Sequence, residues 1–496
     1  MSNINESTWK SQSGYVWSLI GSAVGFANIL SFSAQVYKNG GGAFLIPYCL
    51  ALFMLGIPLL LLEGMIGYKL KAPVVTAYGQ ACGRIGKTLG WLAILACLTI
   101  GGFYIVLTGY SAAYTYFFAI DAIPEDSKTF FLQSFLKVSE SLSDWGTLSM
   151  PVFFATVAVA IATWLVLVRN VRDGIEKVCS TFMPLLAVIM TVFAIAVCFL
   201  PGGINGWMYY LKPDFSKLFD PALWRDVFGQ LFFSLSLGLG IIVGYSRHTG
   251  QTTNIARAML YVAMGDFAVS FISGAAIFGC LAHISYVQGI PFDSILTSDS
   301  TFEIGFILFP KILKAFGPLS QYLGMTFFFC VFIAGITGVF SIVESIAGNV
   351  EVEFKTSRKK AVTYTIAAIM GLATLFSMSN ASHLIDALAP MVLGTNMLIG
   401  GLALIIVFQY ICPKLKNDPL WRSRGHYTFY GFCLRYVAPT LLAIILIGNM
   451  QQELQSVDLA KAIRWAWFFI AISISYAMAK YSEDLKPVGA KEYMKA

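Results

Sequence analysis

The sequence predicts an all-α integral membrane protein with twelve transmembrane helices, of which the first and the sixth are broken. Of its 496 residues, 57% are hydrophobic and 12% are charged, and the mean hydropathy is +0.73. A helix needs about 20 mostly apolar residues to cross a bilayer. Apolar runs of suitable length occupy residues 13–37, 43–69, 89–119, 150–168, 175–200, 225–246, 257–286, 319–350, 360–378, 384–411, 430–449 and 460–480.

The distribution of charge predicts how the chain sits in the membrane. If the N-terminus is cytoplasmic, the segments on that side carry most of the lysines and arginines, which predicts a multi-pass protein of the cell membrane with both termini inside. The polar N-terminus leads directly into the first span, and we expect no cleavable signal. The net charge of +7 therefore reflects topology and not nucleic-acid binding.

No motif in the sequence indicates an enzyme or a thiolate metal site. The nine cysteines show neither a CxxC pair nor a cluster with histidine. There is also no nucleophile–base constellation and no phosphate loop.

The first break falls in the stretch GSAVGFAN, residues 21–28. In hydrocarbon, backbone can leave the helix only where protein buries it or where it lines a wet cavity. We therefore predict an unwound segment from Gly21 to Asn28, with free carbonyls that suit a cation and free amides that suit an anion. A kinked packing helix with the spacing Gly21-x-x-x-Gly25 is the alternative.

The second break falls in the sixth run, GQLFFSLSLGLGIIVGY, where Ser234, Ser236, Gly238 and Gly240 interrupt the helix. Five runs precede it, so the breaks occupy equivalent positions in two five-helix halves of opposite orientation. Paired breaks in inverted halves indicate a transport site at mid-membrane. The predicted segments are a cytoplasmic lead 1–12, a first repeat 13–200, a second repeat 225–411, two further helices in 412–480 and a cytoplasmic tail 481–496.

Three acidic residues fall inside apolar runs, where a carboxylate costs about 2.5–3.5 kcal/mol and needs a partner. We interpret Asp266 as a cation ligand, with Asn28 and Ser234 on the broken helices close to it; a protonated structural acid is the alternative. Glu63 and Glu344 are expected to be hydrogen-bonded to unwound backbone. Thr337 could add a hydroxyl to a second cation site, although a membrane threonine often satisfies its own helix.

These motifs together resemble the neurotransmitter:sodium symporter family, in particular its bacterial amino-acid transporters of the leucine-transporter type. The most specific segments are SAVGFAN, NGGGAFLIPY, GIPLLLLEG and GQLFFSLSLGLG. The rule of paired breaks was itself described for the leucine transporter. The resemblance implies ten helices in two inverted repeats, two C-terminal helices, and substrate and sodium at mid-membrane.

The resemblance also implies a set of site residues. The first sodium site would use the Ala23 carbonyl, Asn28, Ser234 and Asp266, completed by the substrate carboxylate. The second would use the carbonyls of Gly21, Val24 and Ala334 together with Thr337. The substrate pocket would comprise Ala23, Gly25, Ala27, Ile100, Tyr104, Phe233, Ser234, Ser236, Leu239, Gly338 and Ile342. Tyr104 would bind the carboxylate, Phe233 would cover the ligand, and Gly25 stands where amine transporters carry an aspartate.

Several positions depart from the family pattern. Ser31 stands in place of the outer-gate arginine that would pair with Asp386, and Glu6 and Val352 stand in place of the inner-gate ion pair. Gly338 lacks the serine hydroxyl of the second sodium site, and Ala27 replaces a glycine.

The positions that match the chloride site of chloride-dependent relatives are Tyr48, Gln230, Ser234 and Ser270. Asp266 stands where asparagine is common. We expect its charge to serve in place of chloride, so that chloride is not required.

The sequence thus predicts a symporter that imports a neutral, hydrophobic or aromatic L-amino acid with one or two sodium ions. Two alternatives stay open. One is a membrane sensor that binds an amino acid without net transport. The other is a proton-coupled or exchanging transporter that uses Asp266 as its proton carrier.

Overall fold

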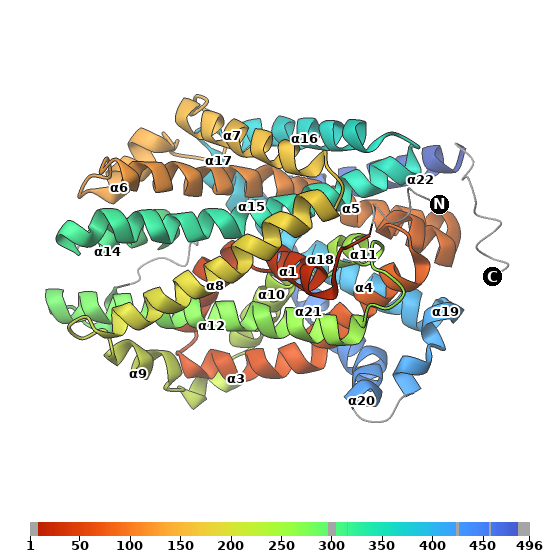
Figure 1. Cartoon of the computed structure of the whole chain (residues 1–496), viewed down its shortest axis with the longest axis horizontal. Helices are drawn as coiled ribbons and strands as arrows, with labels where there is room; N and C mark the ends of the chain where they lie inside the picture. Colours follow the sequence, from red (N-terminus) through yellow and green to blue (C-terminus); the bar gives the residue numbers. More distant parts are fainter. Residues whose placement is uncertain (1–7, 296–303, 315, 423–425, 456–457, 485–496) are drawn as a thin grey trace.

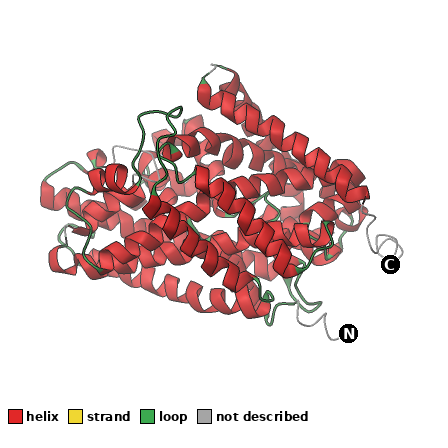
Figure 2. Cartoon of the chain, turned by 90° about the horizontal axis from the view of Figure 1, so that it is seen from above, coloured by secondary structure: helices red, strands yellow, loops and turns green. Residues whose placement is uncertain are grey.

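The computed structural model describes residues 8–295, 304–314, 316–422, 426–455 and 458–484. Every regular element in these residues is helical (Figure 2), and the isolated bridges are Gly41 with Pro213 and Leu148 with Met378. The helices of the first half are α1 Gln12–Ala23, α2 Phe32–Lys38, α3 Gly42–Ala51, α4 Ile57–Leu70, α5 Val74–Ala119, α7 Met150–Leu167 and α8 Lys177–Cys198. Those that follow are α10 Pro221–Ser234, α11 Ile241–Ser246, α12 Ile255–Gln288, α15 Ser320–Glu353, α16 Arg358–Leu375, α17 Ala381–Ala389, α18 Asn396–Ile405, α20 His426–Phe432, α21 Ala438–Leu454 and α22 Leu459–Asp484.

The long helices run between two ends of the molecule (Figure 1). The short helices α6 Ser127–Thr129, α9 Asn205–Leu211 and α14 Phe309–Lys314 lie at one end, and α19 Pro413–Lys416 lies at the other.

The predicted count of twelve spans is not confirmed by the lengths and compositions of the described helices. Within the described residues, nine helical stretches are long and apolar enough to cross a bilayer, or ten if the bent pair α1 and α2 is one span. The predicted sixth span is divided into α10 and α11, and the predicted ninth, α16, opens with three basic residues, Arg358, Lys359 and Lys360. The helical architecture is confirmed, whereas the count of twelve is not.

The third predicted span proved too short. The sequence places its start at residue 89, but α5 begins at Val74 and bends at Cys82 and Gly83, where the φ of Gly83 is +59°. The bend explains the difference, because the polar segment before residue 89 forms a separate helical arm that hydropathy does not detect.

The predicted break in the first span is confirmed, but it is shorter than predicted. α1 continues to Ala23, the chain bends by 61°, and a π-helical turn at Ala27–Ser31 leads into α2. Gly21 stays helical because Val24 N–H still donates to the carbonyl of Ile20 at 2.7 Å. The unwound part is therefore confined to the residues around Val24 and Gly25.

The break in the sixth span is also confirmed. α10 ends at Ser234, and α11 begins at Ile241. Between them Ser236, Gly238 and Gly240 adopt positive φ angles of +53°, +79° and +73°. The Gly238 amide, which no helix satisfies, donates to Glu63 Oε1 at 2.7 Å, and Glu63 is fully buried. The predicted role of Glu63 is thus confirmed.

Gly238→Ala tests this turn. Alanine rarely adopts the positive φ found here, and its methyl would lie 2.8 Å from the Met397 carbonyl oxygen. We therefore expect the free energy of unfolding to fall by about 1–3 kcal/mol. Gly229→Ala is the matched control, because nothing lies within 4 Å of its new methyl and a helical alanine gains up to about 1 kcal/mol. The measurement is the midpoint of thermal unfolding of the purified protein in detergent, and equal midpoints for the two variants would contradict the account.

Candidate functional site

The end of α1 presents unsatisfied backbone oxygen to the centre of the molecule. The last carbonyls of a helix have no intrahelical donor, and here they belong to Gly21, Ser22 and Ala23. The Gly25 amide turns away from them and donates to Asn28 Oδ1 at 2.8 Å. Asn28 therefore satisfies the free amide at the break, and the carbonyl oxygens at the end of α1 stay available to a ligand.

A buried polar cluster joins the two breaks to α12. Asn28 Nδ2 lies 2.7 Å from Asp266 Oδ1, 2.9 Å from Ser234 Oγ and 2.8 Å from Ser270 Oγ. Ser234 Oγ donates to the Asp266 carboxylate, at 2.8 and 2.9 Å from its two oxygens. Asp266 is fully buried, and no basic side chain in the described part of the chain pairs with it. A buried carboxylate without a cation is costly, so the cluster is suited to receive one.

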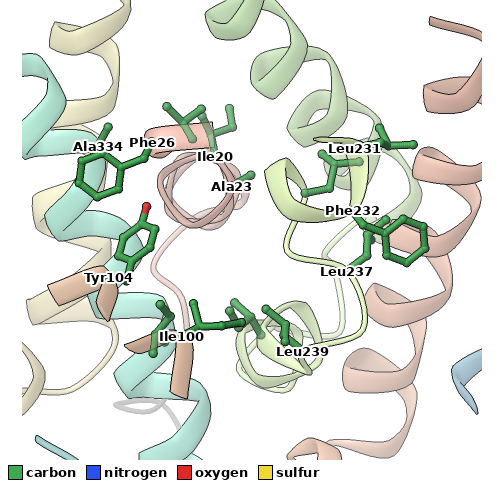
Figure 3. Close-up of a cluster of buried hydrophobic side chains, with 14 of the residues drawn as sticks. Ile20, Ala23, Phe26, Ile100, Tyr104, Leu231, Phe232, Leu237, Leu239 and Ala334 are labelled. Carbon is green, nitrogen blue, oxygen red and sulfur yellow. The ribbon is translucent and has the colours of Figure 1, made fainter. Parts of the chain in front are cut away.

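A small cavity lies beside this cluster. Its volume is about 30 Å³, and its walls include ten of the eleven predicted pocket residues: Ala23, Gly25, Ala27, Ile100, Tyr104, Phe233, Ser236, Leu239, Gly338 and Ile342. Ser234 is absent from its lining and belongs to the polar cluster instead. Figure 3 shows Ile100 and Tyr104 on one side of this region and Leu239 on the other.

The cavity also has walls that the sequence prediction missed, namely Ser22, Ile241 and Ser341. Ser341 follows Gly338 by three residues and so lies on the same face of α15; helical spacing could have identified it. Ser22 and Ile241 border the two breaks, so proximity along the chain was the available signal.

Two glycines make room for the Tyr104 hydroxyl. A Cβ atom at Gly25 would lie 2.2 Å from Tyr104 Oη, and one at Gly338 would lie 2.6 Å from it. The ring of Phe26 packs edge-on against Tyr104, with centroids 5.0 Å apart. The hydroxyl is therefore held between the first break and α15, at the wall of the cavity.

Two residues of the predicted second sodium site, Gly21 and Thr337, lie close to one methionine, Met183. Met183 Sδ lies 3.8 Å from Thr337 Oγ1, and it is also the atom closest to a Cβ placed on Gly21. Thr337 Oγ1 donates to the carbonyls of Ile333 at 2.9 Å and of Ala334 at 3.2 Å. In this arrangement the threonine satisfies its own helix, which is the alternative left open by the sequence.

The predicted chloride-equivalent residues are divided between two networks. Ser234 and Ser270 belong to the polar cluster, whereas Gln230 Nε2 donates to the Ala27 carbonyl at 2.8 Å. Ser31 Oγ donates to Gln230 Oε1 at 2.9 Å. Tyr48 is fully buried and lies edge-on to Phe32.

The predicted gate residues are spread over the molecule. Phe233 lines the cavity, Asp386 is exposed on α17, and Val352 is 42% exposed on α15. Glu6 lies outside the described residues.

The prediction for Glu344 was wrong. Its buried carboxylate is not bound to unwound backbone but lies 2.5 Å from Arg358 Nη2 and 3.7 Å from both Arg247 and His248. Burial and the charge of Arg247 lower the pKa of His248, which agrees with the neutral ring accepting a hydrogen bond from Arg247 Nε at 2.9 Å. Arg358 opens the next helix, α16, whereas Arg247 comes from a distant segment that sequence reasoning could not place.

Comparison with known proteins identifies the family. A profile of the Sodium:neurotransmitter symporter family matches residues 6–127 and 120–489. The chain belongs to the sodium:neurotransmitter symporter family. An uncharacterized sodium-dependent transporter of Methanocaldococcus jannaschii is 32% identical over 407 residues, which cover 82% of each chain.

Other members of the family are more distant. An uncharacterized sodium-dependent transporter of Haemophilus influenzae is 27% identical, over 90% of this chain and 99% of its own. The human sodium- and chloride-dependent GABA transporter 2 is 25% identical, over 82% of this chain and 72% of its own. The crystal structure of MhsT in complex with L-phenylalanine shares the fold, with a TM-score of 0.77, 24% identity, and coverage of 89% of this chain and 99% of that one. The protein is therefore a multi-pass, sodium-coupled membrane transporter and not an enzyme.

Proposed function

We propose that this symporter imports a neutral, hydrophobic or aromatic L-amino acid together with sodium by alternating access. The observation that carries the proposal is the buried Asp266, which lacks a basic partner in the described residues and lies between the two helix breaks. The first repeat, 13–200, and the second, 225–411, would form the moving parts around this site.

The donor set supports a sodium ion at Asp266. Its carboxylate, the Ser234 hydroxyl and the carbonyl end of α1 are oxygen ligands, which hard cations prefer. The Asn28 amide oxygen would join them once Asn28 turns away from Gly25. A second ion would occupy the carbonyls of Gly21, Val24 and Ala334 with Thr337.

The substrate carboxylate would complete the first sodium shell. Ion and substrate then stabilise each other by the same free energy, and this reciprocal coupling is what makes a symporter. An inward-negative potential adds about 2.3 kcal/mol per net charge per 100 mV.

The cavity lining supports an apolar substrate side chain. Ile100, Phe233, Leu239, Ile241 and Ile342 form much of its wall. Amine transporters carry an aspartate at the position of Gly25, beside the Tyr104 hydroxyl. Because Gly25 supplies no carboxylate there, the substrate would bring its own. MhsT, which shares the fold, was solved with L-phenylalanine. One water needs about 10–15 Å³ of such volume, so a cavity of about 30 Å³ must widen before it admits an amino acid.

Uptake into proteoliposomes tests the proposal. With sodium outside, labelled phenylalanine or leucine should accumulate above its external concentration, and choline in place of sodium at fixed pH should abolish accumulation. Binding without accumulation would indicate a sensor. Accumulation that follows a proton gradient without sodium would indicate proton coupling through Asp266.

Tyr104→Phe removes the hydroxyl proposed to bind the substrate carboxylate. A hydrogen bond to a charged group contributes about 1.5–3 kcal/mol, so the dissociation constant should rise about 10- to 150-fold. Tyr110→Phe, on the same helix but outside the cavity lining, is the control and should bind as the wild type does. Scintillation proximity binding measures both, and an unchanged affinity for Tyr104→Phe would argue against this pocket.

Asp266→Asn tests whether this carboxylate serves in place of chloride. Two sodium ions and one zwitterion leave excess positive charge in a medium of low dielectric constant, which an anion must balance. The wild type should therefore transport in gluconate, whereas Asp266→Asn should lose transport in gluconate and recover part of it in chloride. The exposed Asp293→Asn serves as control. Strict chloride dependence of the wild type would refute the idea.

A further inference from the structure

We propose that Glu176 is a latch that holds the N-terminal end of α1 against α8 and so opposes the separation of the two helices. Glu176 is 5% exposed and lies in the π-helical turn Arg172–Glu176, directly before α8. Its role in transport rests on the proposed function; the contacts that define it do not.

The latch consists of backbone hydrogen bonds to the start of α1. The Lys10 amide donates to Glu176 Oε2 at 2.6 Å, and the Ser11 amide donates to Oε1 at 3.2 Å. The Ser11 hydroxyl lies 3.3 Å from Oε1 as well. A carboxylate at a helix N-terminus also opposes the positive end of the helix dipole.

This arrangement is a capping box completed by a neighbouring helix. Ser11 is the N-cap of α1, and its Oγ accepts from the Gly14 amide at 2.9 Å. In an ordinary capping box the residue at the Gly14 position is a glutamate or glutamine that reaches back to the N-cap amide. Gly14 has no such side chain, and Glu176 of the neighbouring segment takes over.

Gly14 is also what lets Glu176 approach. A Cβ atom at position 14 would lie 1.8 Å from Glu176 Oε1 and 2.4 Å from its carboxyl carbon. The Glu176 carboxylate thus occupies the space that a side chain at position 14 would fill. A substitution at either Gly14 or Glu176 should therefore break the latch.

A second contact fixes the same segment to the sixth span. Trp9 is buried, its Nε1 donates to the Tyr245 carbonyl at 2.9 Å, and its amide donates to the His248 carbonyl at 3.1 Å. Residues 9–14 therefore bind α1 to both α8 and α11. Because α1 is joined to the rest of the first span by the break at Val24 and Gly25, it is a hinged rod, and the latch acts on its free end.

A native cysteine reports the position of α1. Cys179 of α8 is 1% exposed, and its Sγ lies 3.1 Å from a Cβ placed on Gly21 of α1. The thiol can react with a water-soluble maleimide only when α1 separates from α8. The experiment uses full-length protein in detergent, with Cys179 as the only cysteine, and measures its labelling rate in sodium.

We expect Glu176→Gln and Gly14→Ala each to raise the labelling rate at least about tenfold, which corresponds to about 1.4 kcal/mol. Glu140→Gln, at an exposed position in another loop, should leave the rate unchanged. Unchanged rates in both latch variants would overturn the proposal. The result does not depend on transport, because labelling measures the position of α1 even if no amino acid is carried.

A double variant separates a latch from a simple cap. Gly14→Glu with Glu176→Ala supplies the α1 capping box from within α1 but removes the tether to α8. Fast labelling of this double variant supports the latch. A return to the wild-type rate would mean that Glu176 only stabilises the helix end, and would overturn the proposal.

Discussion

Unpaired peptide groups in an apolar interior govern this structure. A helix that breaks inside a bilayer exposes amides and carbonyls that no water can satisfy. At the first break the Gly25 amide bonds to Asn28, and at the second the Gly238 amide bonds to Glu63. In both cases a side chain takes the amide, while carbonyl oxygen at the end of α1 stays available. The two breaks therefore favour a cation between them.

The same constraint explains why charged groups occur at such depth. Asp266 connects α12 to both breaks through Asn28 and Ser234, and it does so without a basic partner in the residues described. Glu344, by contrast, lies 2.5 Å from Arg358 Nη2, and Glu63 accepts a hydrogen bond from the Gly238 amide. The charge of Glu344 is thus balanced by arginine, whereas under the proposed function a sodium ion would balance the charge of Asp266.

Much of the site could be predicted from the sequence because its signals are local. Apolar runs locate the helices, glycine and serine locate the breaks, and the positions around Tyr104 follow from motifs. The length of the first break could not be predicted, because the residue types do not determine whether the Val24 amide keeps its bond to the Ile20 carbonyl. Two other contacts join residues that are far apart in the chain, Glu344 with Arg247 and Glu176 with Lys10, and no local pattern encodes such contacts.

These features together link the ion to the movement of α1. The carbonyls of Gly21 and Ala23 belong to the same short rod whose other end is held by Glu176 and Trp9. A ligand shifts a conformational equilibrium only by its difference in affinity between the two states. If sodium binds these carbonyls as proposed, moving α1 would remove ligands from the ion, and sodium would then favour the arrangement in which α1 lies against α8. The latch adds to this preference without touching the ion, which makes the free energy of closure adjustable independently of sodium affinity.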